Sequence, residues 1–159
     1  MSTTKKELNV EALCQVIAWA EQSSKTKGKI TQRRLERAFP EWGFWHQGSW
    51  GARQTLVSEA EAEACKTSWC VAGQTVHQSE RYQPNWEVGN TQLHNARDTQ
   101  TGRTLSVSDA ARRELGLTES EANMMFGGHN TIRDLKAHAN EACYARRIPL
   151  MYPEVGLDR

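Results

Sequence analysis

The side chains best suited to covalent chemistry are thiols in the segment Cys65-Lys-Thr-Ser-Trp-Cys-Val-Ala-Gly-Gln-Thr-Val-His77. We expect the second thiol, Cys70, in the first turn of a helix. The helix dipole there lowers the pKa of a thiol and favours the nucleophilic thiolate. His77 is the candidate base from the same segment, and the other histidines are His46, His94, His129 and His138. This pattern is that of a small cysteine-dependent hydrolase or transferase.

The same segment also suits the packed centre of a fold. Thr67 or Ser68 is a suitable N-cap for the helix that follows. A glycine inside a helix costs roughly 1 kcal/mol relative to alanine, so Gly73 beside Ala72 indicates that another backbone packs closely. In this interpretation, which we prefer, Cys70 is a buried structural thiol.

Signals for a metal or a cofactor are weak in this chain. Cys65 and Cys70 have the spacing of half a zinc site, but no second closely spaced pair of Cys or His accompanies them. A disulfide between the two is disfavoured in a reducing cytosol. The chain has no glycine-rich phosphate loop and no dinucleotide-binding motif. We therefore predict no metal site and no cofactor.

Tryptophan is concentrated in the middle of the chain. Six tryptophans are present, and five of them lie between Trp42 and Trp86. Such residues form either a core or a protein-binding surface, and core packing is the default for a domain of this size. The candidate binding surface consists of Trp45, Trp50 and Trp69.

A local basic patch accompanies a predicted pair of helices near the N-terminus, over residues 5–23 and 31–39. Its members are Lys29, Arg33, Arg34 and Arg37. Two helices with such a patch are typical of helix-turn-helix DNA-binding proteins. However, the connecting loop is long, Glu36 and Glu41 dilute the charge, and the whole chain carries a net charge of only +1. Nucleic-acid binding is therefore an alternative, and a solvated basic face is the default.

Length and composition fit one folded domain. The chain has 159 residues, of which 38% are hydrophobic and 25% charged. A chain of this size buries a hydrophobic core without needing disulfides or metal ions for stability. Residues 1–40 are expected as an N-terminal helical pair, and residues 41–159 as the core domain, together in one globular unit. We find neither a stretch long enough to span a membrane nor a signal-peptide core, and expect a cytoplasmic protein.

The predicted fold class is mainly α (α+β), a compact helical domain with a small β-hairpin. The hairpin joins residues 91–97 and 103–107, which flank a turn-rich stretch. We expect the core to form from the central helix and the last two helices. Further expected elements are an exposed helix over residues 52–64 and a loop over residues 78–90.

Capping signals mark the ends of the predicted C-terminal helices. Ser108 precedes a helix over residues 109–115, which Gly116 closes. Thr118 and Glu121 form the Thr-x-x-Glu pattern of a capping box. The last helix is expected over residues 131–145 with Asn130 as its cap.

Three segments together show a resemblance to a known family. They are Phe44-Trp-His-Gln-Gly-Ser-Trp50, Cys65-Lys-Thr-Ser-Trp-Cys-Val-Ala-Gly73 and Val107-Ser-Asp-Ala-Ala-Arg-Arg-Glu-Leu-Gly-Leu-Thr-Glu-Ser-Glu-Ala-Asn-Met-Met-Phe126. Their order resembles a family of small uncharacterised proteins common in actinobacteria and their phages. That pattern runs aromatic-x-x-Gly-Ser/Thr-Trp, then Cys-Gly-Thr-x-x-Cys-x-Ala-Gly, then Ala-x-x-x-Leu-Gly-Leu-Thr-x-x-x-Ala-x-x-Leu-Phe. Lys66 departs from it where the family has glycine, and Met125 where it has leucine.

The resemblance covers residues 44–126 and implies a shared fold and a phage or mobile-element origin. It implies no activity. We therefore predict a phage-type accessory protein without enzymatic activity, which binds a host macromolecule, in the first place a host protein, in the host cytoplasm. One alternative is cysteine-dependent catalysis by Cys70 with His77, and the other is nucleic-acid binding by the basic N-terminal helices.

Overall fold

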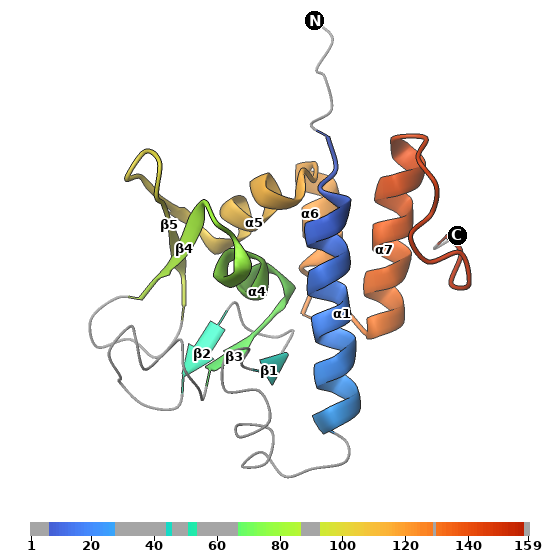
Figure 1. Ribbon diagram of the computed structural model, residues 1–159, viewed down its shortest axis with the longest axis horizontal. Helices are drawn as coiled ribbons and strands as arrows, with labels where there is room; N and C mark the ends of the chain where they lie inside the picture. Colours follow the sequence, from blue (N-terminus) through green and yellow to red (C-terminus); the bar gives the residue numbers. More distant parts are fainter. Residues whose placement is uncertain are drawn as a thin grey trace, which may run out of the picture.

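The computed structural model describes residues 7–27, 44–45, 51–53, 67–86, 93–128 and 130–157, with the backbone alone for 23–27, 44–45, 51–53 and 67–69. In this part of the chain five helices pack together (Figure 1). They are α1 (Val10–Lys27), α4 (Val71–Gln78), α5 (Val107–Leu115), α6 (Glu119–Met125) and α7 (Ile132–Ala145). None of these helices is long and apolar enough to cross a lipid bilayer.

Two small sheets accompany the helices. Sheet A has the strand order β1-β3-β2, from β1 (Phe44–Trp45), β3 (Thr67–Trp69) and β2 (Gly51–Arg53). Sheet B has the order β4-β5-β6 and is antiparallel throughout, from β4 (Tyr82–Asn85), β5 (Asn95–Asp98) and β6 (Thr104–Ser106). The hairpin of β5 and β6 is the one expected from the sequence. The predicted fold class, mainly α with a small hairpin, is confirmed.

Helix α4 lies at the centre of the fold, as the small residues of its segment indicate. Every residue from 71 to 76 is buried, and α4 packs against α5, α1 and β4. The predicted cap is wrong, because Thr67 and Ser68 belong to β3, which pairs with a strand on each side. The helix therefore begins later, and its N-cap is Cys70, whose Sγ accepts a hydrogen bond from Gly73 N at 3.4 Å.

Helix α1 contributes more to the core than the sequence suggests. It lies between α4 and α7 (Figure 1) and packs against both, with Leu13, Val16 and Ile17 fully buried. The helix begins at Val10, later than the predicted residue 5, and Asn9 Oδ1 accepts a hydrogen bond from Ala12 N at 3.1 Å just before its first turn. The expected core of α4, α6 and α7 is thus completed by α1 and α5.

The capping box of α6 is confirmed. Thr118 Oγ1 accepts from Glu121 N at 3.2 Å, and Glu121 Oε2 accepts from Thr118 N at 2.8 Å. Two other predicted caps are wrong. Ser106 rather than Ser108 caps α5, since α5 already begins at Val107 directly after β6.

The second wrong cap is that of α7, where Thr131 takes the position expected for Asn130. Thr131 forms a capping box with Asp134. The Asn130 amide instead donates to the carbonyls of Met124 and Met125, at 2.7 and 3.0 Å. Asn130 thereby supplies hydrogen bonds to carbonyl groups at the C-terminal end of α6, which have no partner within the helix, rather than to the start of α7.

One further expectation is wrong, and a second is wrong at its first two residues, because strands replace the expected structure there. The predicted loop over residues 78–90 contains β4, in which Pro84 lies opposite Ala96. A proline is tolerated here because β4 is the outer strand of sheet B in the described part of the chain. A helix is predicted over residues 52–64. Residues 52 and 53 belong to β2 instead, and residues 54–64 lie outside the described residues. The predicted helix over residues 31–39 lies there too.

Gly116 closes α5 as predicted and brings α5 against the start of α1. Its φ of 72° is left-handed, and a Cβ at this position would collide with the backbone carbonyl of Glu7. Directly beside it, Asn9 N donates to Leu115 O at 2.9 Å. Glycine is therefore required here both by conformation and by space.

We expect Gly116→Ala to destabilise the protein far more than Gly102→Ala, which is its matched control. Gly102 has a similar φ of 74° but no atom within 4 Å of an added Cβ. The control therefore loses only the left-handed preference, roughly 1–2 kcal/mol, whereas Gly116→Ala must also displace the Glu7 backbone. Thermal unfolding measures both, at about 2–4 °C per kcal/mol. Equal losses in the two variants would contradict the close approach.

Candidate functional site

Sheet A brings together two segments that carry the predicted aromatic surface. In the parallel pair of β1 and β3, Trp45 is the register partner of Trp69. In the antiparallel pair of β2 and β3, Gly51 is the partner of Trp69 from the other side. The backbone thus places Trp45 and Trp69 on neighbouring strands, while Trp50, which precedes Gly51 in sequence, lies outside the described residues.

Cys70 lies in the core and not in an open cleft. Only 1% of its surface is exposed. Burial raises the pKa of the Cys70 thiol to about 12, although the backbone amides of Gly73, Ala72 and Cys70 itself lower it. Desolvation therefore raises the pKa by more than the amides at the helix N-terminus lower it, and the thiol stays protonated near neutral pH. The preferred interpretation of Cys70 as a buried structural thiol is therefore confirmed, and its burial argues against the alternative of a reactive thiolate.

The described histidines do not complete a catalytic pair with Cys70. His77 follows Cys70 by seven positions on α4, which separates the two by roughly 10 Å along the helix axis. His94 is exposed, and His138 Nε2 lies 3.2 Å from Asn130 Oδ1. His46 and His129 lie outside the described residues. No histidine is among the groups that shift the Cys70 pKa.

The basic patch and the first cysteine of the central segment are not part of the described structure. Lys29, Arg33, Arg34, Arg37 and Cys65 all lie outside the described residues. Among the residues that are described, no group of three or more His, Cys, Asp or Glu side chains could hold a metal ion. The basic patch remains a prediction from the sequence.

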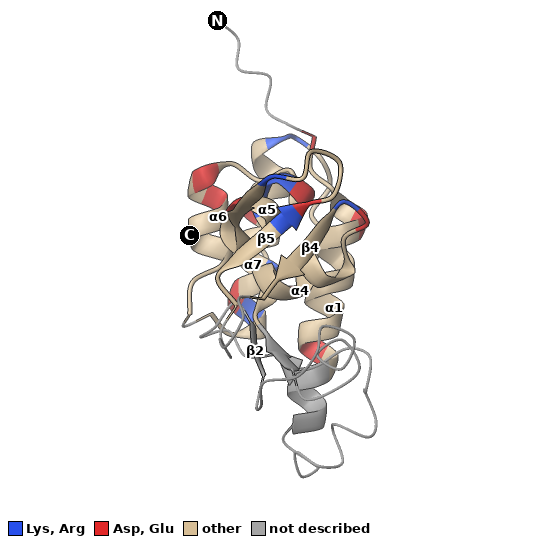
Figure 2. Cartoon of the chain, turned by 90° about the vertical axis from the view of Figure 1, so that its left-hand side faces the viewer, with Lys and Arg blue, Asp and Glu red and all other residues tan. Residues whose placement is uncertain are grey.

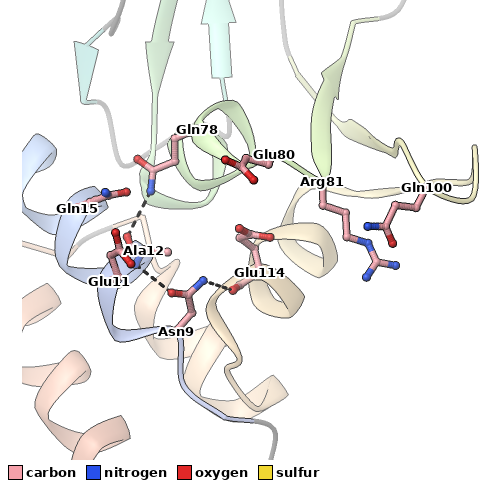
Figure 3. A pocket seen from close by; sticks show the side chains of 9 residues that line it. All are labelled: Asn9, Glu11, Ala12, Gln15, Gln78, Glu80, Arg81, Gln100 and Glu114. Atoms are coloured by element: carbon pink, nitrogen blue, oxygen red, sulfur yellow. Dashed lines mark hydrogen bonds between the residues drawn. The ribbon is translucent and has the colours of Figure 1, made fainter.

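A polar pocket of about 620 Å³ lies where α1, α5 and the connection from α4 to β4 meet. Figure 3 shows its side chains entering from these elements and from the turn after β5. The lining residues are Asn9, Glu11, Ala12, Gln15, Gln78, Glu80, Arg81, Gln100 and Glu114. The sequence did not reveal this site, since its residues are spread from position 9 to position 114 and form no motif.

Hydrogen bonds between elements hold the walls of the pocket. Asn9 Nδ2 donates to Glu114 O at 3.2 Å, which joins the start of α1 to the end of α5. Gln78 Nε2 donates to Ala12 O at 3.3 Å, which joins the end of α4 to α1 (Figure 3). These two hydrogen bonds join three helices around the pocket.

Arg81 is the one cation among the described residues that line the pocket, and it is already paired with a neighbouring carboxylate. Arg81 Nη2 lies 2.9 Å from Asp98 Oδ2, and its Nε donates to Asp98 Oδ1 at 3.3 Å. The hydrogen bond from Arg81 and those from the amides of Gln100 and Thr101 lower the pKa of Asp98 to about 2. The hydrogen bond to Asp98 raises the pKa of Arg81, and the nearby charge of Glu114 adds to this effect. Figure 2 shows acidic and basic positions close together around β4, β5 and α5.

Comparison of the chain with models of protein families, with curated proteins and with solved structures gives no match.

We expect stability to depend on pH through the pair of Arg81 and Asp98. The pKa of Asp98 falls from an ordinary 3.8 to about 2 on folding, so its stabilising effect is complete above the ordinary value and is lost as pH falls through the lower one. Asp98→Asn should therefore unfold at a lower temperature than wild type near neutral pH. The difference should disappear as the solution is acidified from 3.8 towards 2.

Melting curves at a series of pH values test this, with Asp109→Asn as the control. Asp109 has a mostly exposed carboxylate 3.8 Å from Arg112, and its removal should leave a small difference across the series. A difference between wild type and Asp98→Asn that stays constant in acid would contradict the ion pair.

We further expect Cys14 and Cys70 to differ sharply in reactivity. Cys14 is an exposed free thiol on α1, whereas Cys70 is buried. Brief treatment of the native protein with iodoacetamide, followed by peptide mass mapping, should label Cys14 and leave Cys70 unmodified until denaturant is added. Equal labelling of the two in the native protein would restore the catalytic interpretation of Cys70.

Proposed function

We propose that this chain is a phage-type accessory protein that acts by binding a host protein, with the segments of sheet A as its binding surface. The observation that carries this proposal is the register of sheet A. Trp45 and Trp69 are far apart in sequence and are partners in the pairing of β1 with β3. The strand that follows Trp50 pairs with Trp69 from the other side.

Both composition and strand order favour a protein partner. Tryptophan is enriched among the residues that dominate binding energy in protein interfaces. In the described part of sheet A, β1 and β2 are the outer strands. Outer strands offer unpaired backbone groups to which a partner adds a strand. β1 also packs against α1, so β2 is the strand that favours such an addition. Strand addition at an outer strand is a common mode of peptide recognition.

The alternatives receive less support. A cysteine-dependent reaction requires a thiolate, and the Cys70 thiol is buried with a raised pKa. Binding of nucleic acid would use Lys29, Arg33, Arg34 and Arg37. The net charge of the chain is only +1, so it adds little electrostatic attraction to phosphate groups. The phage origin and the host cytoplasm as location follow from the resemblance in sequence, which the proposal adopts.

Affinity capture tests the proposal, with the tagged full chain in an actinobacterial lysate and with nuclease-treated and untreated arms. We expect a host protein in stoichiometric amount that survives nuclease. Trp45→Ala and Trp69→Ala should each weaken its binding by roughly thirtyfold, the effect of losing about 2 kcal/mol at an interface hot spot. Circular dichroism verifies that the variants fold.

Tyr144→Ala is the matched control, because Tyr144 is an aromatic residue on α7 with 54% of its surface exposed. It should bind the captured protein as wild type does. Folded Trp45→Ala and Trp69→Ala variants that bind equally well would contradict the proposed surface. Recovery that disappears with nuclease would favour the basic patch, and Arg33→Ala with Arg34→Ala would then be the variants to compare.

A further inference from the structure

Residues 148–157 form a strap that lies alongside α7 (Figure 1). None of these described residues belongs to a helix or a strand. The apolar side chains of the strap pack against the core but stay only partly buried; they are Ile148, Leu150, Met151 and Tyr152. A segment whose contacts are partly exposed costs less free energy to detach than a fully buried element. The strap is therefore a candidate for a unit that moves separately from the helices.

One asparagine on α7 anchors the strap. Asn140 Nδ2 donates to Tyr152 O at 2.8 Å and to Gly156 O at 2.6 Å, and Asn140 Oδ1 accepts from Tyr152 N at 2.9 Å. Both amide donors are thus used by the strap. Because Asn140 is 0% exposed, loss of its side chain would leave three backbone groups of the closed strap without partners.

The strap covers a second side of α7. Leu135 and Ala142 belong to the hydrophobic core. At about 100° per residue, Ala137 and Asn140 lie more than about 90° round the helix from both of them. Ala137 and Asn140 are nevertheless buried, and Asn140 bonds directly to the strap. Detachment of the strap would therefore uncover this side of α7 while Leu135 and Ala142 stay packed in the core.

The other polar contact of the strap is weaker. Lys136 Nζ lies 5.2 Å from the centre of the Tyr152 ring and 3.0 Å from Glu21 Oε1 on α1. It thereby bridges the strap and α1. A cation over an aromatic ring and a partly exposed ion pair each stabilise only modestly, so Asn140 remains the main polar anchor.

The residue that joins α7 to the strap has an unfavourable conformation. Arg147 has a φ of 56° and is the one non-glycine residue with a positive φ in the described part of the chain. The left-handed region is unfavourable for a residue with a Cβ. Hydrogen bonds of 3.1 Å from Arg147 N to Tyr144 O and from Ile148 N to Cys143 O hold it there. Because opening of the strap would let Arg147 leave this conformation, the strain favours the open state.

We infer that the strap opens as a unit about Arg147 while the helices stay folded, with Asn140 as its anchor. Opening uncovers Ala137 and Asn140 on α7. The strap is thus a conformational device built onto one side of a single helix. It does not use sheet A and does not depend on the host-protein proposal.

Amide hydrogen exchange followed by NMR on the full chain tests the inference. Tyr152 N–H reports on the strap, and Gln74 N–H, which donates to Cys70 O at 2.9 Å, reports on α4. Relative to the rates of an unstructured chain, we expect Tyr152 to exchange roughly a hundredfold faster than Gln74, because it requires only local opening. Equal protection of the two amides would overturn the inference.

Val76→Ala separates opening of the strap from global unfolding. Val76 is fully buried in α4, so its truncation should destabilise the whole fold and speed exchange at Gln74 by roughly tenfold. Exchange at Tyr152 should stay at the wild-type rate, since α4 remains folded when the strap opens. An equal increase at Tyr152 would show that the strap detaches only when the whole protein unfolds.

Two pairs of variants test the hinge and the anchor. Arg147→Gly removes the strain and should slow exchange at Tyr152 by roughly fivefold, whereas Ala145→Gly, which places glycine within α7, should not slow it.

Asn140→Ala should speed exchange at Tyr152 by roughly tenfold, and Asn123→Ala, at an exposed position on α6, should leave it unchanged. An unchanged Tyr152 rate in Arg147→Gly would overturn the hinge, and an unchanged rate in Asn140→Ala would overturn the anchor.

Discussion

The half-buried ion pair between Arg146 and Glu121 is the interaction on which the C-terminal half of the fold depends. Its two short contacts are Nη1 to Oε1 at 2.7 Å and Nη2 to Oε2 at 2.8 Å. Arg146 also donates to Ala142 O and Gly116 O, so one side chain joins α5, α6 and α7. Burial opposes the charge on Glu121, but hydrogen bonds from Arg146 and Thr118 outweigh it and lower its pKa. Removing either partner would leave the other charge without its partner in a partly buried site, which destabilises the fold.

The position of the polar pocket follows from this interaction. Arg146 binds the carbonyl of Gly116, and Gly116 is the point where α5 meets the backbone before α1. Next to it, the Asn9 backbone and side chain bond to Leu115 and Glu114. The ion pair between α6 and the end of α7 is thereby linked through Gly116 to α5 and to the start of α1, which form two of the pocket walls.

Cys70 shows how tertiary burial reverses a local electrostatic argument. A thiol at the start of a helix is expected to ionise readily. In this fold the same position is covered, since α4 is enclosed by α1, α5 and β4, and burial of the thiol raises its pKa. The Cys70 sulfur instead accepts the hydrogen bond from Gly73 N that a serine or threonine usually accepts. Its role is to cap the central helix.

The sequence by itself determined the local elements whose signals are complete within a few residues: the Thr118 and Glu121 capping box, the closing Gly116, the β5–β6 hairpin and the burial of α4. These depend on backbone hydrogen bonds and conformations that neighbouring residues control. Only the tertiary structure decided that Pro84 lies in an outer strand, that Cys70 is desolvated and that three distant glutamates share a pocket. Each of these depends on packing between segments far apart in the chain, which no local pattern encodes. Likewise, only the tertiary structure pairs β1 with β3 and so makes Trp45 and Trp69 register partners.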